Sequence, residues 1–141
     1  MRQQLSETLA AITDLQSEAQ LSQLDDAVRA VAPCACGPAE VRALLGVFER
    51  FPEEDGYGIF WGIVHALEAC PGYETEVIES VRRKPCEFNV LLIVRMLSSG
   101  ITVVDGTPLD VVLRSVQSSA AATAQAVEDA MTCLELRKPP A

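Results

Sequence analysis

The side chains with the widest chemical range are concentrated in residues 51–73, FPEEDGYGIFWGIVHALEACPGY. This segment holds the only Trp and the only His of the chain, together with a run of three acids. His65 and Glu68 are three positions apart, a spacing at which a helix brings two side chains together, so the carboxylate could orient the imidazole as a general base. Such a pair also needs a nucleophile, and nothing in the pattern marks Cys70 or a Ser as one. We therefore expect that the chain is not an enzyme.

A helix over residues 59–70 would place Trp61, His65 and Glu68 on one face, because these residues are four and three positions apart. Two interpretations fit this stripe. In the first, Trp61 belongs to the core and the His-Glu pair satisfies its indole N–H. In the second, the stripe is exposed and Trp61 anchors a protein partner.

Acidic residues are concentrated around the same segment. The net charge of the chain is −9, and residues 51–80 carry seven acids and no Lys or Arg. A negative field of this kind repels nucleic acid and steers the chain toward a basic partner. A charge run is more often a solvated face that aids solubility, so that interpretation stays open. We expect no nucleic-acid partner.

The cysteines and the apolar runs bear on the compartment. Five Cys residues without a signal peptide predict reduced thiols in a cytoplasm. The longest apolar run, residues 90–97, is broken by Arg95 and is too short to cross a membrane. Cys34 and Cys36 form the only close pair, and no second ligand pair accompanies them, so we expect neither a metal nor another cofactor. Cys70 and Cys133 lie on apolar helical faces and are expected to pack as small hydrophobic side chains.

The elements that must position these residues are predicted to be helices. Strand formers do not alternate, and Ala, Leu, Glu and Arg dominate, which predicts an all-α fold. We expect one domain over residues 1–141, with a loose tail at residues 137–141. Apolar spacing predicts about eight helices and one β-like patch at residues 101–104. The helices are expected at residues 3–20, 24–31, 38–48, 59–70, 73–83, 86–99, 107–117 and 118–136.

The helices recur in pairs. Pairs begin near residues 3, 38, 73 and 107, a period of about 35 residues that is typical of helical-hairpin solenoids. No consensus tetratricopeptide or ankyrin residues are present, so this prediction depends on period and pairing alone. We expect antiparallel helix pairs arranged either as a HEAT-like α-solenoid or as a compact irregular helical bundle.

The central segment also resembles a known family. The pattern consists of FPEEDGYG at residues 51–58, Phe60-Trp61, His65, Leu67-Glu68 and PGYE at residues 71–74. It is similar to that of small all-helical bacterial immunity proteins, which accompany the toxin domains of polymorphic toxin systems of the Rhs and contact-dependent inhibition type. ESVRR at residues 79–83 and RMLSSG at residues 95–100 fit the same pattern, so the resemblance covers roughly residues 40–110.

The resemblance implies a cytoplasmic protein that binds a cognate toxin domain and blocks its active site or substrate access. Together with the charge pattern, it leads us to expect that the partner-binding residues are Glu53, Glu54, Asp55, Tyr57, Trp61, His65 and Glu68. Pro52, Gly56, Gly58 and Trp61 could instead serve the fold. The alternative function is a helical-repeat adaptor or scaffold that binds a basic partner without inhibiting an enzyme.

Overall fold

The computed structural model describes residues 2–31 and 36–138, which contain eight α-helices and one small β hairpin. The strands β1 (Val103–Val104) and β2 (Thr107–Pro108) pair antiparallel. The predicted all-α fold class is confirmed. The helices are α1 (Arg2–Ala10), α2 (Glu18–Arg29), α3 (Pro38–Arg50), α4 (Ile59–Glu68), α5 (Tyr73–Arg83), α6 (Glu87–Ser98), α7 (Leu109–Gln117) and α8 (Ala124–Arg137), with a 3-10 turn, η2 (Gly56–Gly58), before α4.

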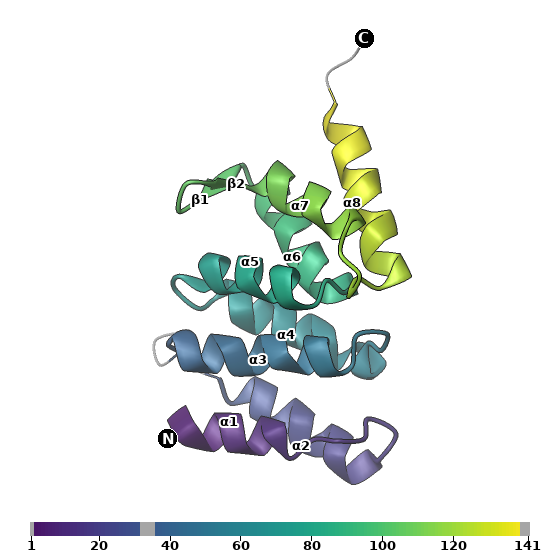
Figure 1. The fold of residues 1–141 in the computed structure, drawn as a ribbon. Helices are drawn as coiled ribbons and strands as arrows, with labels where there is room; N and C mark the ends of the chain where they lie inside the picture. The colour runs from purple at the N-terminus through teal and green to yellow at the C-terminus, as the bar shows by residue number, and fades with distance from the viewer. Residues whose placement is uncertain (1, 32–35, 139–141) are drawn as a thin grey trace.

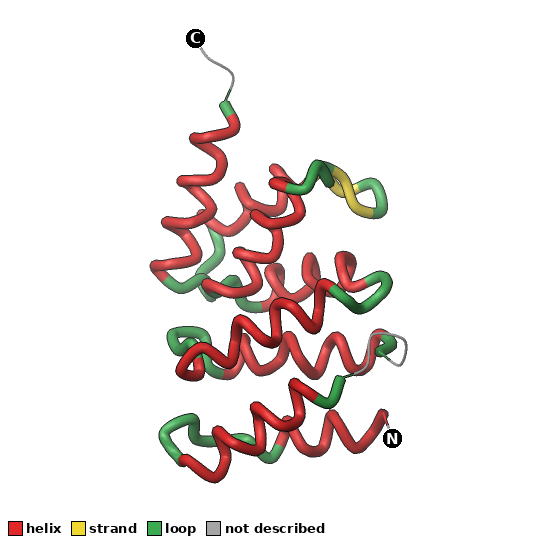
Figure 2. The backbone as a smooth tube through the Cα atoms, turned by 180° about the vertical axis from the view of Figure 1, so that it is seen from behind, coloured by secondary structure: helices red, strands yellow, loops and turns green. Residues whose placement is uncertain are grey.

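Consecutive helices form four hairpins, and the hairpins are stacked on one another (Figure 1). The odd-numbered helices make one layer, in which α1 packs on α3, α3 on α5, and α5 on α7. The even-numbered helices make the second layer in the same order, as Figure 2 shows from behind. The hairpins begin at Arg2, Pro38, Tyr73 and Leu109, close to the predicted pair starts. The chain is therefore a compact helical bundle with the layering of a short solenoid.

The first predicted helix, over residues 3–20, is wrong in its length. Helix α1 ends at Ala10, and α2 starts at Glu18. The segment between them is held by side chains that compete with the helix. The Gln20 side-chain oxygen accepts the backbone N–H groups of Thr13 at 2.6 Å and Asp14 at 3.1 Å. Local side-chain acceptors of this kind offer the backbone an alternative to helical hydrogen bonds.

Two predicted helix starts are also wrong. Helix α2 starts at Glu18 instead of residue 24, and the Ser17 side chain accepts the N–H of Gln20 and forms its cap. Helix α8 starts at Ala124 instead of residue 118, because the Thr123 side chain accepts the N–H of Ala126 and forms its cap. In both places a Ser or Thr at the N-cap supplies the acceptor that the first turn lacks.

The centre of the core is a cluster of three Phe rings. Phe48 of α3, Phe60 of α4 and Phe88 of α6 are buried, with ring centroids 5.3 to 5.4 Å apart. Aromatic pairs at such distances contribute about 0.5–1.5 kcal/mol each beyond the area they bury. The cluster therefore joins the second hairpin to the third and fixes which side of α4 faces inward.

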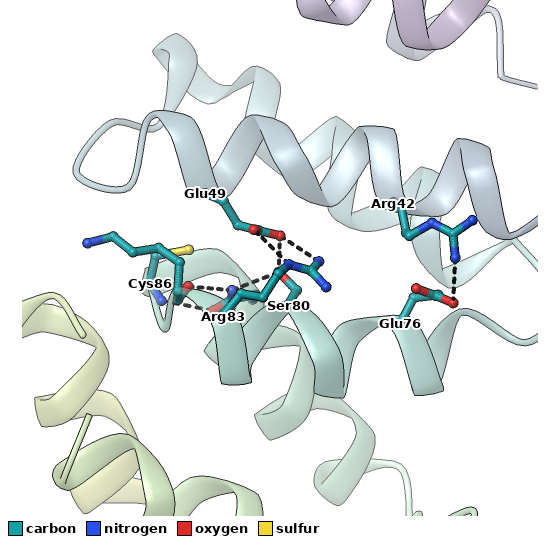
Figure 3. Close-up of polar contacts among 8 residues, drawn as sticks. Arg42, Glu49, Glu76, Ser80, Arg83 and Cys86 are labelled. Carbon is teal, nitrogen blue, oxygen red and sulfur yellow. Dashed lines mark hydrogen bonds and ion pairs between the residues drawn. The ribbon is translucent and has the colours of Figure 1, made fainter. Parts of the chain in front are cut away.

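A polar network ties α5 to its neighbours (Figure 3). Arg83 donates to both carboxylate oxygens of Glu49, at 3.1 and 2.9 Å, and the Ser80 hydroxyl donates to the same carboxylate at 2.8 Å. The Asn89 amide donates to the Ser80 hydroxyl at 3.0 Å and to the Lys84 carbonyl at 2.9 Å. Ser80 and Asn89 are buried, so their polar atoms require these partners. The network thereby sets the position of α5 against α3 and α6.

A disulfide closes the α3–α4 hairpin. Cys36 precedes α3 and Cys70 follows α4, and their Cα atoms are 5.7 Å apart. The prediction of reduced thiols is wrong for this pair, although Cys70 is buried as its apolar helical face predicted. Cys34, the other member of the predicted close pair, lies outside the described residues. Over residues 2–31 and 36–138, no helix is both long enough and apolar enough to cross a membrane.

Reduction of the Cys36–Cys70 bond should lower the free energy of unfolding by about 4 kcal/mol, the chain-entropy value for a loop of this length. Urea unfolding followed by circular dichroism, with and without dithiothreitol, measures the difference. The variant Cys36→Ser/Cys70→Ser should give one midpoint in both buffers, and Cys133→Ser should keep the full response to reductant. Identical midpoints for the unchanged chain would show that the bond does not form in solution.

Candidate functional site

The turn before α4 sets the direction of the candidate site. Residues 56–58 all have positive φ, and the Asp55 carboxylate accepts the N–H of Tyr57 at 3.0 Å. Gly56 is required here, because a Cβ at this position would lie 2.9 Å from Cδ1 of the buried Phe60. Tyr57 adopts φ 53° and is 70% exposed. The turn thus projects Tyr57 into solvent and starts α4 at Ile59.

The predicted stripe of α4 lies at the surface. Trp61 is 44% exposed, and its ring lies edge-on to Phe88 of the core at 6.0 Å. The His65 side chain is 65% exposed, and its ring lies 6.3 Å from that of Trp61. Trp61 and His65 are thus exposed, as the second interpretation requires, and the contact of Trp61 with a partner stays a prediction.

Glu68, the third member of the stripe, has a structural partner. Arg95 of α6 donates two hydrogen bonds to its carboxylate, at 2.7 and 2.8 Å. The His65 Nδ1 atom lies farther away, at 3.9 Å from the same carboxylate. The bidentate pair raises the pKa of Arg95 and fastens α4 to α6. Glu68 therefore helps to hold α4 in position, and the positive charge of Arg95 balances its negative charge.

The acidic run lies beside this stripe. Glu53 and Asp55 are exposed, and Glu54 is half-buried and accepts a long hydrogen bond of 3.4 Å from the Gln16 amide. The same Gln16 accepts the Tyr57 hydroxyl at 2.8 Å. None of the three acids forms an ion pair with a Lys or Arg in the described part of the chain.

In the folded chain, several of the other acids in residues 51–80 have cationic partners. The sequence shows no cation within this segment, yet three of its acids meet Arg residues from outside it. The pairs are Glu68–Arg95 at 2.7 Å, Glu76–Arg42 at 3.4 Å and Glu79–Arg82 at 2.9 Å. Fewer acids of this segment are therefore unpaired than the sequence predicts, and the unpaired negative charge is concentrated at the acidic run.

Two acids that the sequence analysis missed add to this charge. Glu87, in the first turn of α6, has its pKa raised by partial burial and then by the negative charges of Asp129 and Asp55. Glu87 of α6 therefore lies within electrostatic reach both of Asp55, in the turn before α4, and of Asp129 of α8. Glu87 also directly precedes Phe88, the ring against which Trp61 packs. No local pattern relates residues 55, 87 and 129, so only the fold brings them together.

A shallow groove lies between α2 and α4, and the exposed Tyr57 is one of its lining residues. It has a volume of about 480 Å³. Gly62 is one of its lining residues, and a Cβ there would lie 3.4 Å from the Val28 side chain. Its lining residues are Asp25, Val28, Arg29, Tyr57, Gly58, Ile59 and Gly62. We use the name α4 face for this groove together with Glu53, Glu54, Asp55, Trp61, His65 and Glu87.

The free thiols of the described residues are poor nucleophiles. Burial raises the pKa of the Cys86 thiol to about 11, and burial likewise raises the pKa of Cys133. Both are therefore protonated near neutral pH, whereas the thiolate is the reactive form. Within the described ranges, no group of three His, Cys, Asp or Glu side chains is arranged to hold a metal ion. The α4 face therefore presents exposed aromatic side chains beside acids that have no cationic partner in the described part of the chain.

Comparison with known proteins adds no relative. No protein-family model matches the chain, and neither a curated protein nor a solved structure is significantly similar to it.

Because Trp61 is half-exposed, the substitution Trp61→Ala should lower the free energy of unfolding by only about 1 kcal/mol. The neighbouring Phe60→Ala removes a buried ring and should cost about 3–5 kcal/mol. Urea unfolding of the two variants, monitored by circular dichroism, compares them within one helix. A loss for Trp61→Ala as large as that for Phe60→Ala would assign Trp61 to the core.

Proposed function

We propose that this chain is an immunity protein that binds a cognate bacterial toxin domain through the α4 face and blocks the active site or substrate cleft of that domain. The observation that carries the proposal is the pairing of exposed Trp61 and Tyr57 with three acids that lack a cationic partner in the described part of the chain. Trp and Tyr are the residues that most often dominate binding energy in protein interfaces.

The charge of the face favours a basic partner. A negative patch attracts a positive cleft over distances near the Debye length and raises the association rate. Toxin domains that act on nucleic acid or nucleotides have basic clefts, because their substrates are anions. An acidic face that enters such a cleft excludes the substrate, so binding alone suffices for inhibition and the immunity protein needs no catalytic group.

The sequence pattern around residues 51–74 supports the same function, since it resembles that of immunity proteins of polymorphic toxin systems. Its motif residues occupy two kinds of position. Gly56 and Phe60 hold the turn and the core, whereas Tyr57, Trp61 and His65 are exposed. Exposed aromatic residues in a motif are expected where the motif contacts a partner.

For the compartment, we propose the cytoplasm, where an immunity protein meets the toxin before export. The Cys36–Cys70 disulfide argues against the cytoplasm, because disulfides are rare in reducing compartments. Alkylation of free thiols in intact cells, followed by mass spectrometry of the captured chain, decides between them. Alkylated Cys36 and Cys70 agree with a cytoplasmic protein, and an intact bond indicates an oxidising compartment.

The alternative function is an adaptor that binds a basic protein without inhibiting it. The stacked hairpins favour this alternative, because such arrays commonly serve as scaffolds for protein binding. The two functions share the α4 face and differ in what binding does to the partner.

The double variant Glu53→Lys/Glu54→Lys should slow association with the cognate toxin domain by about tenfold and weaken the dependence of that rate on salt. The toxin domain is first identified by capture with the tagged chain, and stopped-flow fluorescence of Trp61 then gives the rate. The melting temperature should hardly change, because these carboxylates are not buried.

The matched control is Glu7→Lys/Glu18→Lys, which changes the net charge equally at exposed positions of α1 and α2. If both double variants slow association to the same extent, only the total charge matters and the acidic run is not the contact. Unfolding of the first variant would instead make the run structural.

A further inference from the structure

Tyr57 adopts a conformation that the core of the protein does not explain. Its φ of 53° lies in the left-handed region, which costs free energy for a residue with a Cβ atom. Gly or Asn would adopt the same conformation more easily. The Tyr57 side chain is 70% exposed, so burial of its ring does not offset this cost. Strained residues of this kind cluster at ligand-binding sites, which favours a role of Tyr57 in binding.

The Tyr57 side chain is also held in place. Its backbone N–H donates to the Asp55 carboxylate at 3.0 Å, and its hydroxyl donates to the Gln16 side-chain oxygen at 2.8 Å. The ring is thus fixed at both ends, although most of its surface is exposed. A side chain that is ordered before its partner arrives loses little conformational entropy on binding.

Two carboxylates flank this ring. Asp55 lies at its backbone end, and Glu54 accepts a hydrogen bond of 3.4 Å from the amide of the same Gln16 that holds the hydroxyl. Neither acid forms an ion pair with a Lys or Arg within residues 2–31 and 36–138. The face of an aromatic ring attracts a cation, and carboxylates nearby add to that attraction. The surroundings of Tyr57 therefore favour a positively charged group.

The groove between α2 and α4, which Tyr57 lines, adds apolar surface. Its volume is about 480 Å³, and Val28 and Ile59 are among its lining residues. Asp25 and Arg29 line it as well, and they form an ion pair at 3.0 Å, so their charges cancel. The net negative charge at the groove therefore comes from the two carboxylates beside Tyr57. A long apolar stem that ends in a cation matches this combination of surfaces.

We propose that this groove binds an arginine side chain of the cognate toxin domain, with the guanidinium on the Tyr57 ring and the stem along Val28 and Ile59. Arginine fits better than lysine, because its guanidinium is planar, stacks on aromatic rings and is more weakly hydrated. Arginine is also the residue that sites for anionic substrates use to hold phosphate. Its capture would remove a substrate contact from the toxin. The choice of partner rests on the proposed function, whereas the groove itself can be tested alone.

The test is an amide NMR titration of the purified full chain with N-acetyl-arginine amide. We expect saturable shifts centred on the amides of Tyr57, Gly58 and Gly62, with a dissociation constant in the millimolar range. N-acetyl-citrulline amide has nearly the same shape without the charge, so it should bind at least about fivefold more weakly. N-acetyl-lysine amide should bind at least about twofold more weakly than the arginine compound.

The variant Tyr57→Asn removes the ring and keeps a residue that tolerates the left-handed conformation, so the chain should stay folded. It should raise the dissociation constant of N-acetyl-arginine amide at least about fivefold. The matched control is Trp61→Ala, which removes an exposed aromatic side chain that does not line the groove. This control should leave the dissociation constant within about twofold. The amide spectrum of each variant checks its fold.

Equal binding of the arginine and citrulline compounds overturns the proposal, and so does an unchanged dissociation constant for Tyr57→Asn. Shifts confined to residues outside the groove do the same. These results do not involve the toxin, so a failure here leaves the immunity function standing. A captured partner that keeps its activity when bound contradicts the immunity function and not the binding of arginine in this groove.

Discussion

The contact of Phe48, Phe60 and Phe88 is the interaction on which the rest of the structure depends. These rings belong to three helices in two hairpins, and their centroids are 5.3 to 5.4 Å apart. Because Phe60 must point into this cluster, the next residue of α4, Trp61, is turned about 100° away from it. Trp61 then packs on Phe88 only in a T-shaped contact, at 6.0 Å between ring centroids, and stays 44% exposed. The same cluster therefore holds the core together and keeps Trp61 at the surface.

Much of this arrangement could be predicted from the sequence, because helices with strong apolar stripes and Gly or Pro at their ends show their limits locally. Helix α5 has the predicted bounds, and Gly56 occupies the positive-φ position expected of a turn. The break after Ala10 could not be predicted, since it depends on the Gln20 side chain capturing the N–H groups of the loop. Arg50 of α3 also holds this break, because it donates to the carbonyls of Leu9 in α1 and Ile12 after it, both at 2.7 Å.

The candidate site was predictable in its local part only. Residues 53–65 are contiguous, so their shared position follows from one turn and one helix. The rest depends on contacts between distant segments, which periodicity does not encode. Arg95 balances Glu68 from 27 positions away, and Glu87 joins the acidic surface from another hairpin. The Cys36–Cys70 bond spans 34 positions and has no spacing signature. The observed site thus differs from the predicted one in the charges and thiols that are paired over long distances in the sequence.

The central claim is that binding to the α4 face inhibits an enzyme. The most direct measurement is the activity of the protein captured with this chain from its source cells, titrated with the purified chain. The account predicts one stoichiometric partner, a large protein with a toxic C-terminal domain, whose activity falls to the background level at one equivalent of chain. A stoichiometric partner that keeps its full activity when bound would contradict the account and favour the adaptor. Capture of several housekeeping proteins at low occupancy would do the same.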